Sequence, residues 1–506
     1  MGDLKNTEQA IKSLSQGKSD VVYTIIPGDL HTPVGILLRF QEYCKDHCFL
    51  FESVINGTSK GRFSVLAHSP DLILQLGRKV STVKDDEGRV LSQTEDGLNA
   101  LRELWATLPQ QLPAELPSMA AGIFGCTSFE AVELLEPKLC FPEPDEQDFP
   151  LGVYIRPRQI LIIDHVRDSL HIVQLVVPKT ETDPHQLIDD AKQEIARSIK
   201  CLQRPLPDMP IKNNTAHGHV TPMSNMSAET FLDHVETCKK YIREGDVFQV
   251  VPSQRFSRPF SLGGIALYRA LRTTNPSPYM FYVRAAGFEL VGSSPEILVK
   301  VENNKVTLRP IAGTRKRGRN EEEDQALAED LRNDPKECAE HLMLLDLGRN
   351  DVGRVSRIGT VKVEDEFIIE RYSHVMHMVS QVTGVLNENS DAIDALLAGL
   401  PAGTVSGAPK IRALEIIAEL EPTRRGIYAG GIGYLGVRGD MDTCLVLRTA
   451  QIRDGVMHVQ AGAGIVYDSV PQSEFEETVN KARALFHAAE VAEERFGESH
   501  ALTNAG

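Results

Sequence analysis

Three segments of this sequence each read as two β-strands around a short turn, and this pattern constrains the fold most. They span residues 154–177, 289–314 and 444–466, with turns at Arg167-Asp168-Ser169, Asn303-Asn304 and Asp454-Gly455. Asn-Asn and Asp-Gly readily adopt the positive φ values that tight hairpin turns require. Helical patterns flank the hairpins, and we expect helices at 184–200, 228–243, 322–347, 391–399, 409–420 and 472–496. Hairpins between helices predict an α+β fold, in which antiparallel sheets form a sandwich flanked by helices.

One polar segment divides the chain into two lobes. Residues 203–228 are rich in Pro, Asn, Ser and Met and have no apolar period, which is typical of a linker. We therefore expect an N-terminal lobe over 1–202, a larger domain over 229–496 and a short tail over 497–506. A length of 506 residues agrees with roughly three domains or two large ones.

Charge and composition exclude several classes of protein. The chain has 54 Lys and Arg against 70 Asp and Glu, a net charge of −16, and no basic stripe. That balance argues against nucleic acid and anionic membranes as partners. No stretch approaches the roughly 20 apolar residues of a membrane-spanning helix. The eight cysteines form no CxxC pair, so we expect a reducing, cytoplasmic location.

Two glycine motifs mimic nucleotide-binding loops. Gly431–Gly436 spells GxGxxG, but a strand-like alternation follows it where a dinucleotide site needs a helix. We expect these glycines to permit close backbone approach within a sheet. Residues 403–410 lack the GK[ST] ending of a phosphate-binding loop, so neither motif predicts a nucleotide site.

Two groups of carboxylates could bind a metal ion. On the C-terminal helix, Glu474, Glu477 and Lys481 share one face beside an apolar stripe. On an earlier helix, Glu337, Glu340 and His341 form a second cluster, and Glu340 abuts the most apolar stretch of that helix. Each could also be ordinary, as a solvated face with a Glu477–Lys481 pair or as an acid near a helix N-terminus. Together, two carboxylate sites would suit Mg²⁺, which prefers oxygen ligands and is often shared with the substrate.

Other features indicate a small anionic ligand. Glycine-rich turns end three strands, at 311–314, 403–407 and 460–464, and their backbone N–H groups can bind carboxylates. Arg448 is expected in the middle of a strand, where its guanidinium could hold a carboxylate in a bidentate fashion.

Eight segments resemble one known family closely. They cover most of residues 230–490 and are FQVVPSQR (248–255), GSSPEILV (292–299), RPIAGTRKRG (309–318), EHLMLLDLGRNDVGRV (340–355), RYSHVMHMVS (371–380), PAGTVSGAPKIRALEII (401–417), YAGGIGYLG (428–436) and QAGAGIVYDS (460–469). By these motifs the chain resembles the chorismate-utilising enzymes, and most of all their anthranilate-forming branch. The resemblance implies Mg²⁺-dependent conversion of chorismate and ammonia to anthranilate and pyruvate, the first step of tryptophan biosynthesis.

The resemblance also assigns residues, position by position. It implies Glu296 as the general acid, His377 for the later elimination of pyruvate, and Thr404 as a further catalytic residue. The implied metal ligands are Glu340, Glu477 and Glu474. The implied chorismate contacts are Gly313, Thr314, Tyr428, Arg448, Gly462, Ala463, Gly464 and Lys481.

Two positions discriminate within the family. Aminodeoxychorismate synthases commonly carry a nucleophilic Lys where this chain has Ala312, and isochorismate synthases carry a Lys base where it has Gln249. Both residues favour direct attack by ammonia and thus anthranilate formation. Aminodeoxychorismate synthase component I is the alternative within the family, and a non-catalytic amino-acid-binding regulator is the alternative outside it.

The resemblance implies one partner and one inhibitor. Cys126 lies in IFGCTSFE, which lacks the second Gly of a glutaminase nucleophile, so we expect a separate glutamine amidotransferase subunit in a heterotetramer. LFES (50–53) and NPSPYMF (275–281) resemble a feedback site for tryptophan. Its implied residues are Glu52, Ser53, Arg62, Pro278, Tyr279 and Met280, which could instead only pack the two lobes together.

Overall fold

The computed structural model describes residues 3–55, 59–144, 149–207, 220–372 and 375–496. The middle of the predicted linker and the whole predicted tail lie outside these ranges, so nothing tests either segment. No helix within the ranges combines the length and apolar composition needed to cross a membrane.

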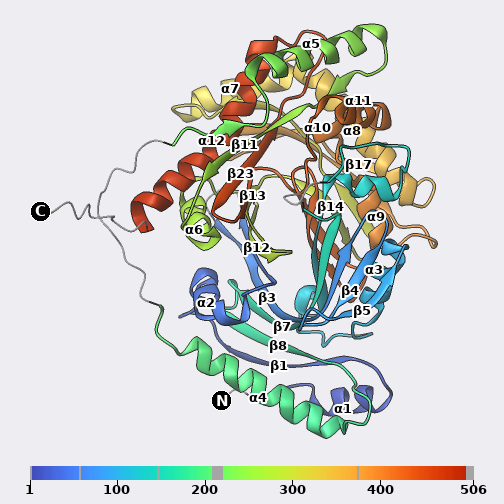
Figure 1. The fold of residues 1–506 in the computed structure, drawn as a ribbon, viewed down its shortest axis with the longest axis vertical. Coiled ribbons are helices and arrows are strands. Elements are labelled where there is room, and N and C mark those ends of the chain that lie inside the picture. The colour runs from blue at the N-terminus through green and yellow to red at the C-terminus, as the bar shows by residue number, and fades with distance from the viewer. Residues whose placement is uncertain (1–2, 56–58, 145–148, 208–219, 373–374, 497–506) are drawn as a thin grey trace, which may run out of the picture.

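Helices cover both ends of the molecule, and α3, α6 and α9 lie beside the strands between them (Figure 1). The helices are α1 (Thr7–Ser15), α2 (Pro33–Arg39), α3 (Gly97–Ala106), α4 (Pro184–Leu202), α5 (Ala228–Glu244), α6 (Gly264–Thr274), α7 (Glu321–Asn333), α8 (Pro335–Val355), α9 (Ala392–Gly399), α10 (Gly403–Ser406), α11 (Lys410–Leu420) and α12 (Pro471–Phe496).

All the strand pairings of the described chain are antiparallel, as the hairpin pattern predicts. In the N-terminal half the strands are β1 (Asp20–Pro27), β2 (Cys48–Ile55), β3 (Ser59–Leu76), β4 (Ser81–Lys84), β5 (Val90–Thr94), β6 (Gly122–Thr127), β7 (Gly152–Asp164) and β8 (Ser169–Val176). In the C-terminal half they are β9 (Met223–Ser224), β10 (Gln249–Val250), β11 (Ser253–Pro259), β12 (Tyr279–Ala285), β13 (Phe288–Ser294), β14 (Ile297–Glu302), β15 (Lys305–Leu308), β16 (Ile311–Lys316), β17 (Lys362–Arg371), β18 (Val375–Val385), β19 (Gly407–Ala408), β20 (Gly431–Gly436), β21 (Met441–Leu445), β22 (Thr449–Arg453) and β23 (Val456–Gly462).

The three predicted hairpins are present. They are β7–β8, β14–β15 and β22–β23, and their turns have positive φ at Asp168, Asn303, Asn304, Asp454 and Gly455. The GxGxxG motif forms strand β20, as the strand-like alternation of the residues after it predicts. The α+β prediction with large antiparallel sheets is therefore confirmed.

One predicted helix is wrong in its extent. The pattern over 322–347 predicts a single helix, but the structure has α7 and α8, separated at Asp334. Pro335 occupies the first turn of α8, where its missing N–H costs nothing, and the Asp334 carboxylate accepts hydrogen bonds from the N–H groups of Lys336 and Glu337. The break at Asp334 therefore fixes where α8, the helix that carries Glu340, begins.

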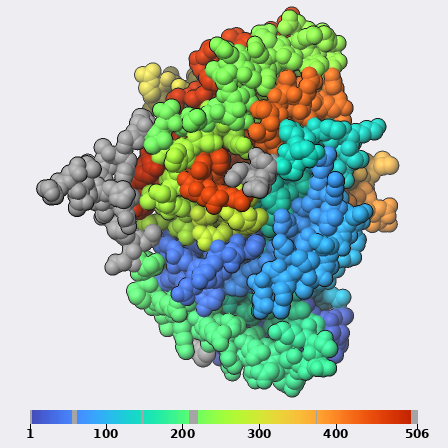
Figure 2. Space-filling view, viewed as in Figure 1, coloured from blue at the N-terminus to red at the C-terminus, as the bar shows by residue number. Residues whose placement is uncertain are grey.

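The two predicted lobes share sheets and core. Strand β2 of the N-terminal half pairs with β12, and β6 pairs with β20. Each of the three large hydrophobic clusters draws residues from both halves. Figure 2 shows the same contact on the surface, where blue residues of the N-terminal half lie against yellow-green residues of the C-terminal half. The boundaries at 202 and 229 stay a prediction.

Candidate active site

A buried carboxyl group occupies the sharp connection between β13 and β14. Glu296 is only 5 % exposed, and its Oε1 accepts a hydrogen bond from Thr404 Oγ1 at 2.9 Å. Burial raises the pKa of Glu296 to about 8, although the hydrogen bond from Thr404 opposes the shift. The group is therefore mainly protonated at neutral pH, which is the form that can donate a proton.

Thr404 is positioned by a tight helical turn. It lies in α10, which follows Leu400-Pro401, and a Cβ at Gly403 would overlap with Leu347 of α8. Glycine at 403 therefore lets α10 pack against α8 and aim the threonine hydroxyl at Glu296.

His377 lies on β18 beside the turn that the sequence singles out at 311–314. Its Nδ1 is 3.2 Å from the Gly313 carbonyl oxygen and 3.1 Å from Thr314 Oγ1. A carbonyl can only accept, so we assign the proton to Nδ1 and the free lone pair to Nε2. Burial, with the charge of Arg448 adding to it, lowers the pKa of His377 to about 4. The imidazole is neutral at pH 7 and can act as a base.

Arg448 differs from its predicted setting. It is not in mid-strand but in a break between β21 and β22, at φ 47°, and its carbonyl oxygen accepts from the Ser293 N–H at 3.1 Å. Its guanidinium pairs with no carboxylate of the described chain. Burial lowers the pKa of Arg448, which remains a cation. A cation without a protein counter-ion suits a substrate carboxylate.

Carboxylates of α8 and α12 lie close enough for their charges to act on one another. Burial raises the pKa of Glu340, and the charges of Glu337 and Glu477 add to the shift, although Gln249 Nε2 donates to Glu340 Oε1 at 2.8 Å. Burial likewise raises the pKa of Glu474, and the charge of Glu477 adds to it.

This donor set fits Mg²⁺. Carboxylates that repel one another are stabilised by a hard cation between them. Within the described ranges no group of three or more His, Cys, Asp or Glu is arranged to enclose a metal. A site with one or two protein carboxylates is what Mg²⁺ accepts when substrate and water supply the remaining oxygens.

The turn after β23 brings the remaining candidates to these carboxylates. A Cβ at Gly464 would lie 2.8 Å from Gln249 Nε2, and a Cβ at Gly462 would lie 3.0 Å from Tyr428 Oη. Lys481 Nζ donates to the Gly462 carbonyl at 2.9 Å and lies 2.7 Å from Glu477 Oε1. The Glu477–Lys481 pair predicted as an ordinary helix pair is thus present, and it abuts the glycine turn.

Sequence reasoning missed one residue of this site. The ring of Tyr372 meets the ring of His377 edge to face, with centroids 5.6 Å apart. Tyr372 stands in the quoted RYSHVMH segment, but a tyrosine five positions before a histidine is too common to single out.

The predicted feedback residues lie on β2, on β3 and at the start of β12. Ser53 is exposed, opposite Tyr279 in the β2–β12 register, and the Pro278 carbonyl accepts from the Val54 N–H. Tyr279 donates to Asp442. The two charged candidates already have protein partners, because Glu52 binds Tyr268 and Arg272 and Arg62 binds Asp164.

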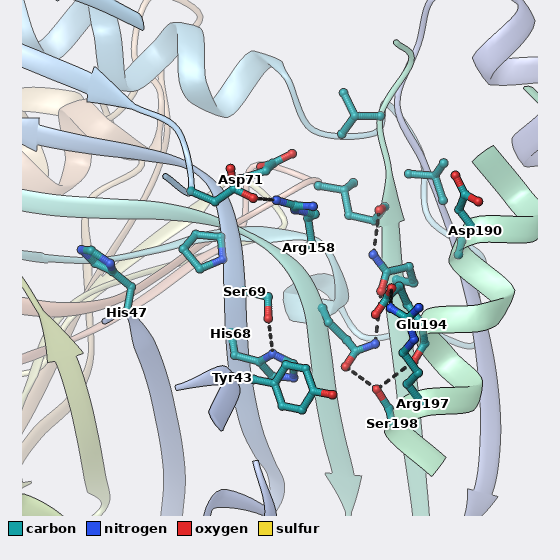
Figure 3. A pocket seen from close by; sticks show the side chains of 18 of the residues that line it. Tyr43, His47, His68, Ser69, Asp71, Arg158, Asp190, Glu194, Arg197 and Ser198 are labelled. Atoms are coloured by element: carbon teal, nitrogen blue, oxygen red, sulfur yellow. Dashed lines mark hydrogen bonds and ion pairs between the residues drawn. The ribbon is translucent and has the colours of Figure 1, made fainter. Parts of the chain in front are cut away.

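A cavity of about 880 Å³ lies elsewhere, between the β3–β7–β8 face and α4 (Figure 3). Buried polar groups on its floor hydrogen-bond one another, Ser198 to Gln159 and Gln159 to Gln174. It contains none of the candidate site residues.

Known proteins resemble the chain over nearly its whole length. The family described as chorismate binding enzyme matches residues 52–487. "Anthranilate synthase component 1" of Cereibacter sphaeroides is 48 % identical over 481 residues, 94 % of this chain and 95 % of that protein. The protein of the same name from Acetivibrio thermocellus is 42 % identical over 489 residues, 93 % of this chain and 97 % of that one.

Two solved structures are also similar to this chain. The crystal structure of anthranilate synthase component I from Streptococcus pneumoniae superposes with a TM-score of 0.73 at 38 % identity, over 85 % of this chain and 94 % of that one. The menaquinone-specific isochorismate synthase of Escherichia coli shares the fold, with a TM-score of 0.70 at 21 % identity, over 96 % of this chain and 98 % of that one.

Proposed function

This chain belongs to the chorismate-binding enzyme family, and from that premise we propose how its residues perform and regulate one reaction. The chain converts chorismate to anthranilate in tryptophan synthesis, as anthranilate synthase component 1. The observation that carries the mechanism is a pair of buried groups, the Glu296 carboxyl bonded to Thr404 and the His377 imidazole bonded to Gly313.

In the first half of the reaction, Glu296 acts as general acid. Ammonia forms a C–N bond at ring carbon C2, the double bond shifts, and the ring hydroxyl leaves with the Glu296 proton as water. One proton then leaves the new ammonium group, which gives an aminated intermediate that keeps its enolpyruvyl ether. Hydroxide is a poor leaving group, so a proton donor of pKa near 8 lowers this barrier. The Thr404 hydroxyl fixes the carboxyl.

In the second half, His377 acts as general base. Its Nε2 takes the ring proton from the carbon that bears the amino group, and the electrons of that C–H bond complete the aromatic ring. The C–O bond to the enolpyruvyl group breaks, and enolpyruvate takes up a proton to become pyruvate. The Nδ1 hydrogen bond to Gly313 keeps the lone pair on Nε2.

We assign Glu340 and Glu477 as the Mg²⁺ ligands, with Glu474 beside them. Bound Mg²⁺ would hold the ring carboxylate and withdraw charge from it. Arg448, Lys481, Thr314, Tyr428 and the backbone N–H groups of Gly313 and of the turn Gly462-Ala463-Gly464 would bind the substrate's anionic groups.

We also propose that ammonia comes from a separate glutaminase subunit in the cytoplasm, within a heterotetramer. Cys126 is buried in β6, and burial raises the pKa of its thiol, so it is no activated nucleophile. The test is the enzyme purified from its native cell. Isolation with no glutaminase attached, and with no glutamine-dependent activity in the extract, would contradict the proposal.

The pH dependence tests Glu296. Because the protonated form is the active one, kcat measured at constant free ammonia should fall as pH rises through about 8. His377 must be neutral to act as a base. Because its pKa is about 4, its protonation should lower kcat only far below pH 7. A kcat that stays level from pH 7 to 9.5 would contradict Glu296 as the acid.

Ser53→Phe tests the feedback site. Ser53 lies opposite Tyr279 at the junction of β2 and β12, so a phenyl ring there should fill the space for tryptophan. We expect inhibition by tryptophan to disappear while kcat changes by less than about twofold. Ser92→Phe on the exposed strand β5 is the matched control. Unchanged inhibition in Ser53→Phe would leave these residues with a packing role only.

A further inference from the structure

Several hydrogen bonds hold Tyr372 beside His377. It lies between β17 and β18, and its ring meets the imidazole at 62° with centroids 5.6 Å apart. This edge-to-face geometry is the favourable one for aromatic pairs. The side chain is half-buried.

Three anchors fix the tyrosine. Its hydroxyl donates to Glu370 Oε2 at 2.9 Å, and Arg309 pairs with the same carboxylate. Its N–H donates to the Val375 carbonyl at 2.8 Å. Its carbonyl oxygen accepts from Arg317 Nη1 at 2.6 Å. These bonds hold the ring against the imidazole.

His377 is also restrained by hydrogen bonds at Nδ1. The Nδ1 hydrogen bonds to Gly313 and Thr314 fix one edge of the imidazole but leave the ring free to tilt about that edge. Contact with the Tyr372 ring removes this freedom. Together the two contacts define where the Nε2 lone pair points.

We propose that Tyr372 is a positioning residue that orients His377 for proton removal in the second half of the reaction. This inference rests on the proposed function and deepens it. The first half uses Glu296 and ammonia and does not need the His377 lone pair. A loosened imidazole should therefore slow elimination selectively, and the aminated intermediate should escape before it becomes anthranilate.

The experiment compares Tyr372→Leu and Tyr372→Phe with the wild-type chain. Each is incubated with chorismate, Mg²⁺ and excess ammonium, and chorismate, intermediate and anthranilate are quantified by chromatography. We expect Tyr372→Leu to consume chorismate within about threefold of the wild-type rate but to form about tenfold less anthranilate, with intermediate making up the difference. Tyr372→Phe keeps the ring and loses the Glu370 anchor, so its shift should be smaller and in the same direction.

Two controls make the result specific. His377→Asn should give the largest share of intermediate. Tyr43→Leu removes a similar contact, Tyr43 to His68 at 5.7 Å, beside the cavity of Figure 3, and should leave the product ratio unchanged.

The possible outcomes distinguish the positioning role of Tyr372 from the proposed mechanism. An unchanged product ratio in Tyr372→Leu, or equal losses in both halves of the reaction, would overturn the positioning role. If Tyr372→Leu fails to fold, an unchanged ratio in Tyr372→Phe overturns it. A wild-type chain that makes no anthranilate would contradict the proposed mechanism instead.

Discussion

Glu296→Gln is expected to lower the kcat of ammonia-dependent anthranilate formation by about 10²–10⁴-fold, the usual contribution of a general acid. The amide keeps the shape of the side chain and can still accept the Thr404 hydrogen bond. It cannot deliver a proton to the departing hydroxyl. The KM for chorismate should change by less than about threefold, because Glu296 contributes to the transition state rather than to binding.

Steady-state kinetics with saturating ammonium measure both constants. Glu302→Gln, on the same strand region but solvent-exposed, is the matched control and should match the wild-type chain. A Glu296→Gln variant that retains more than a tenth of the wild-type kcat would remove Glu296 from the mechanism.

Glu340→Ala should abolish the response to Mg²⁺ and lower activity by about a thousandfold, since metal polarisation is worth several powers of ten in rate. The wild-type carboxylate is half-buried, bonded to Gln249 and repelled by Glu337 and Glu477. A cation relieves that repulsion, and the methyl group of the substituted alanine offers the cation no oxygen.

Binding of Mn²⁺ in place of Mg²⁺, followed by electron paramagnetic resonance with chorismate present, gives a readout independent of turnover. Glu477→Ala should weaken binding as well. Glu476→Ala is the control, because Glu476 is exposed and accepts a hydrogen bond from Gln472. Wild-type affinity in Glu340→Ala would place the metal elsewhere.

Local signals predict the three hairpins and six helical segments, but they leave α1, α2, α3, α6, α10 and many strands unpredicted. The turns at Asn303-Asn304 and Asp454-Gly455 need positive φ, and only a few residue types adopt it readily, so a short stretch of sequence suffices. The split at Asp334-Pro335 also has a local signal in the proline, but the apolar period continues across it and outweighs that signal.

A single sequence does not predict which distant strands pair with one another. Nothing in LFES states that β2 pairs with β12, more than 200 residues away, so the two halves read as separate lobes. Alternating neighbours predict Arg448 in mid-strand, whereas the Ser293 hydrogen bond and the break at φ 47° depend on β13.

The roles of Glu296 and His377 come from resemblance, because a single sequence does not reveal burial. Their protonation states come from the structure, since both pKa shifts arise mainly from desolvation by distant segments. Tyr372 could be found only once the fold had turned it against His377.

The central claim is tested most directly by incubating the purified chain with chorismate, Mg²⁺ and excess ammonium at mildly alkaline pH and recording anthranilate fluorescence. We predict fluorescence that appears without glutamine, disappears with EDTA and returns with added Mg²⁺, together with one pyruvate per anthranilate. Chorismate consumed without pyruvate release would indicate the aminodeoxychorismate reaction, and no consumption with ammonium in excess would contradict catalysis by this site.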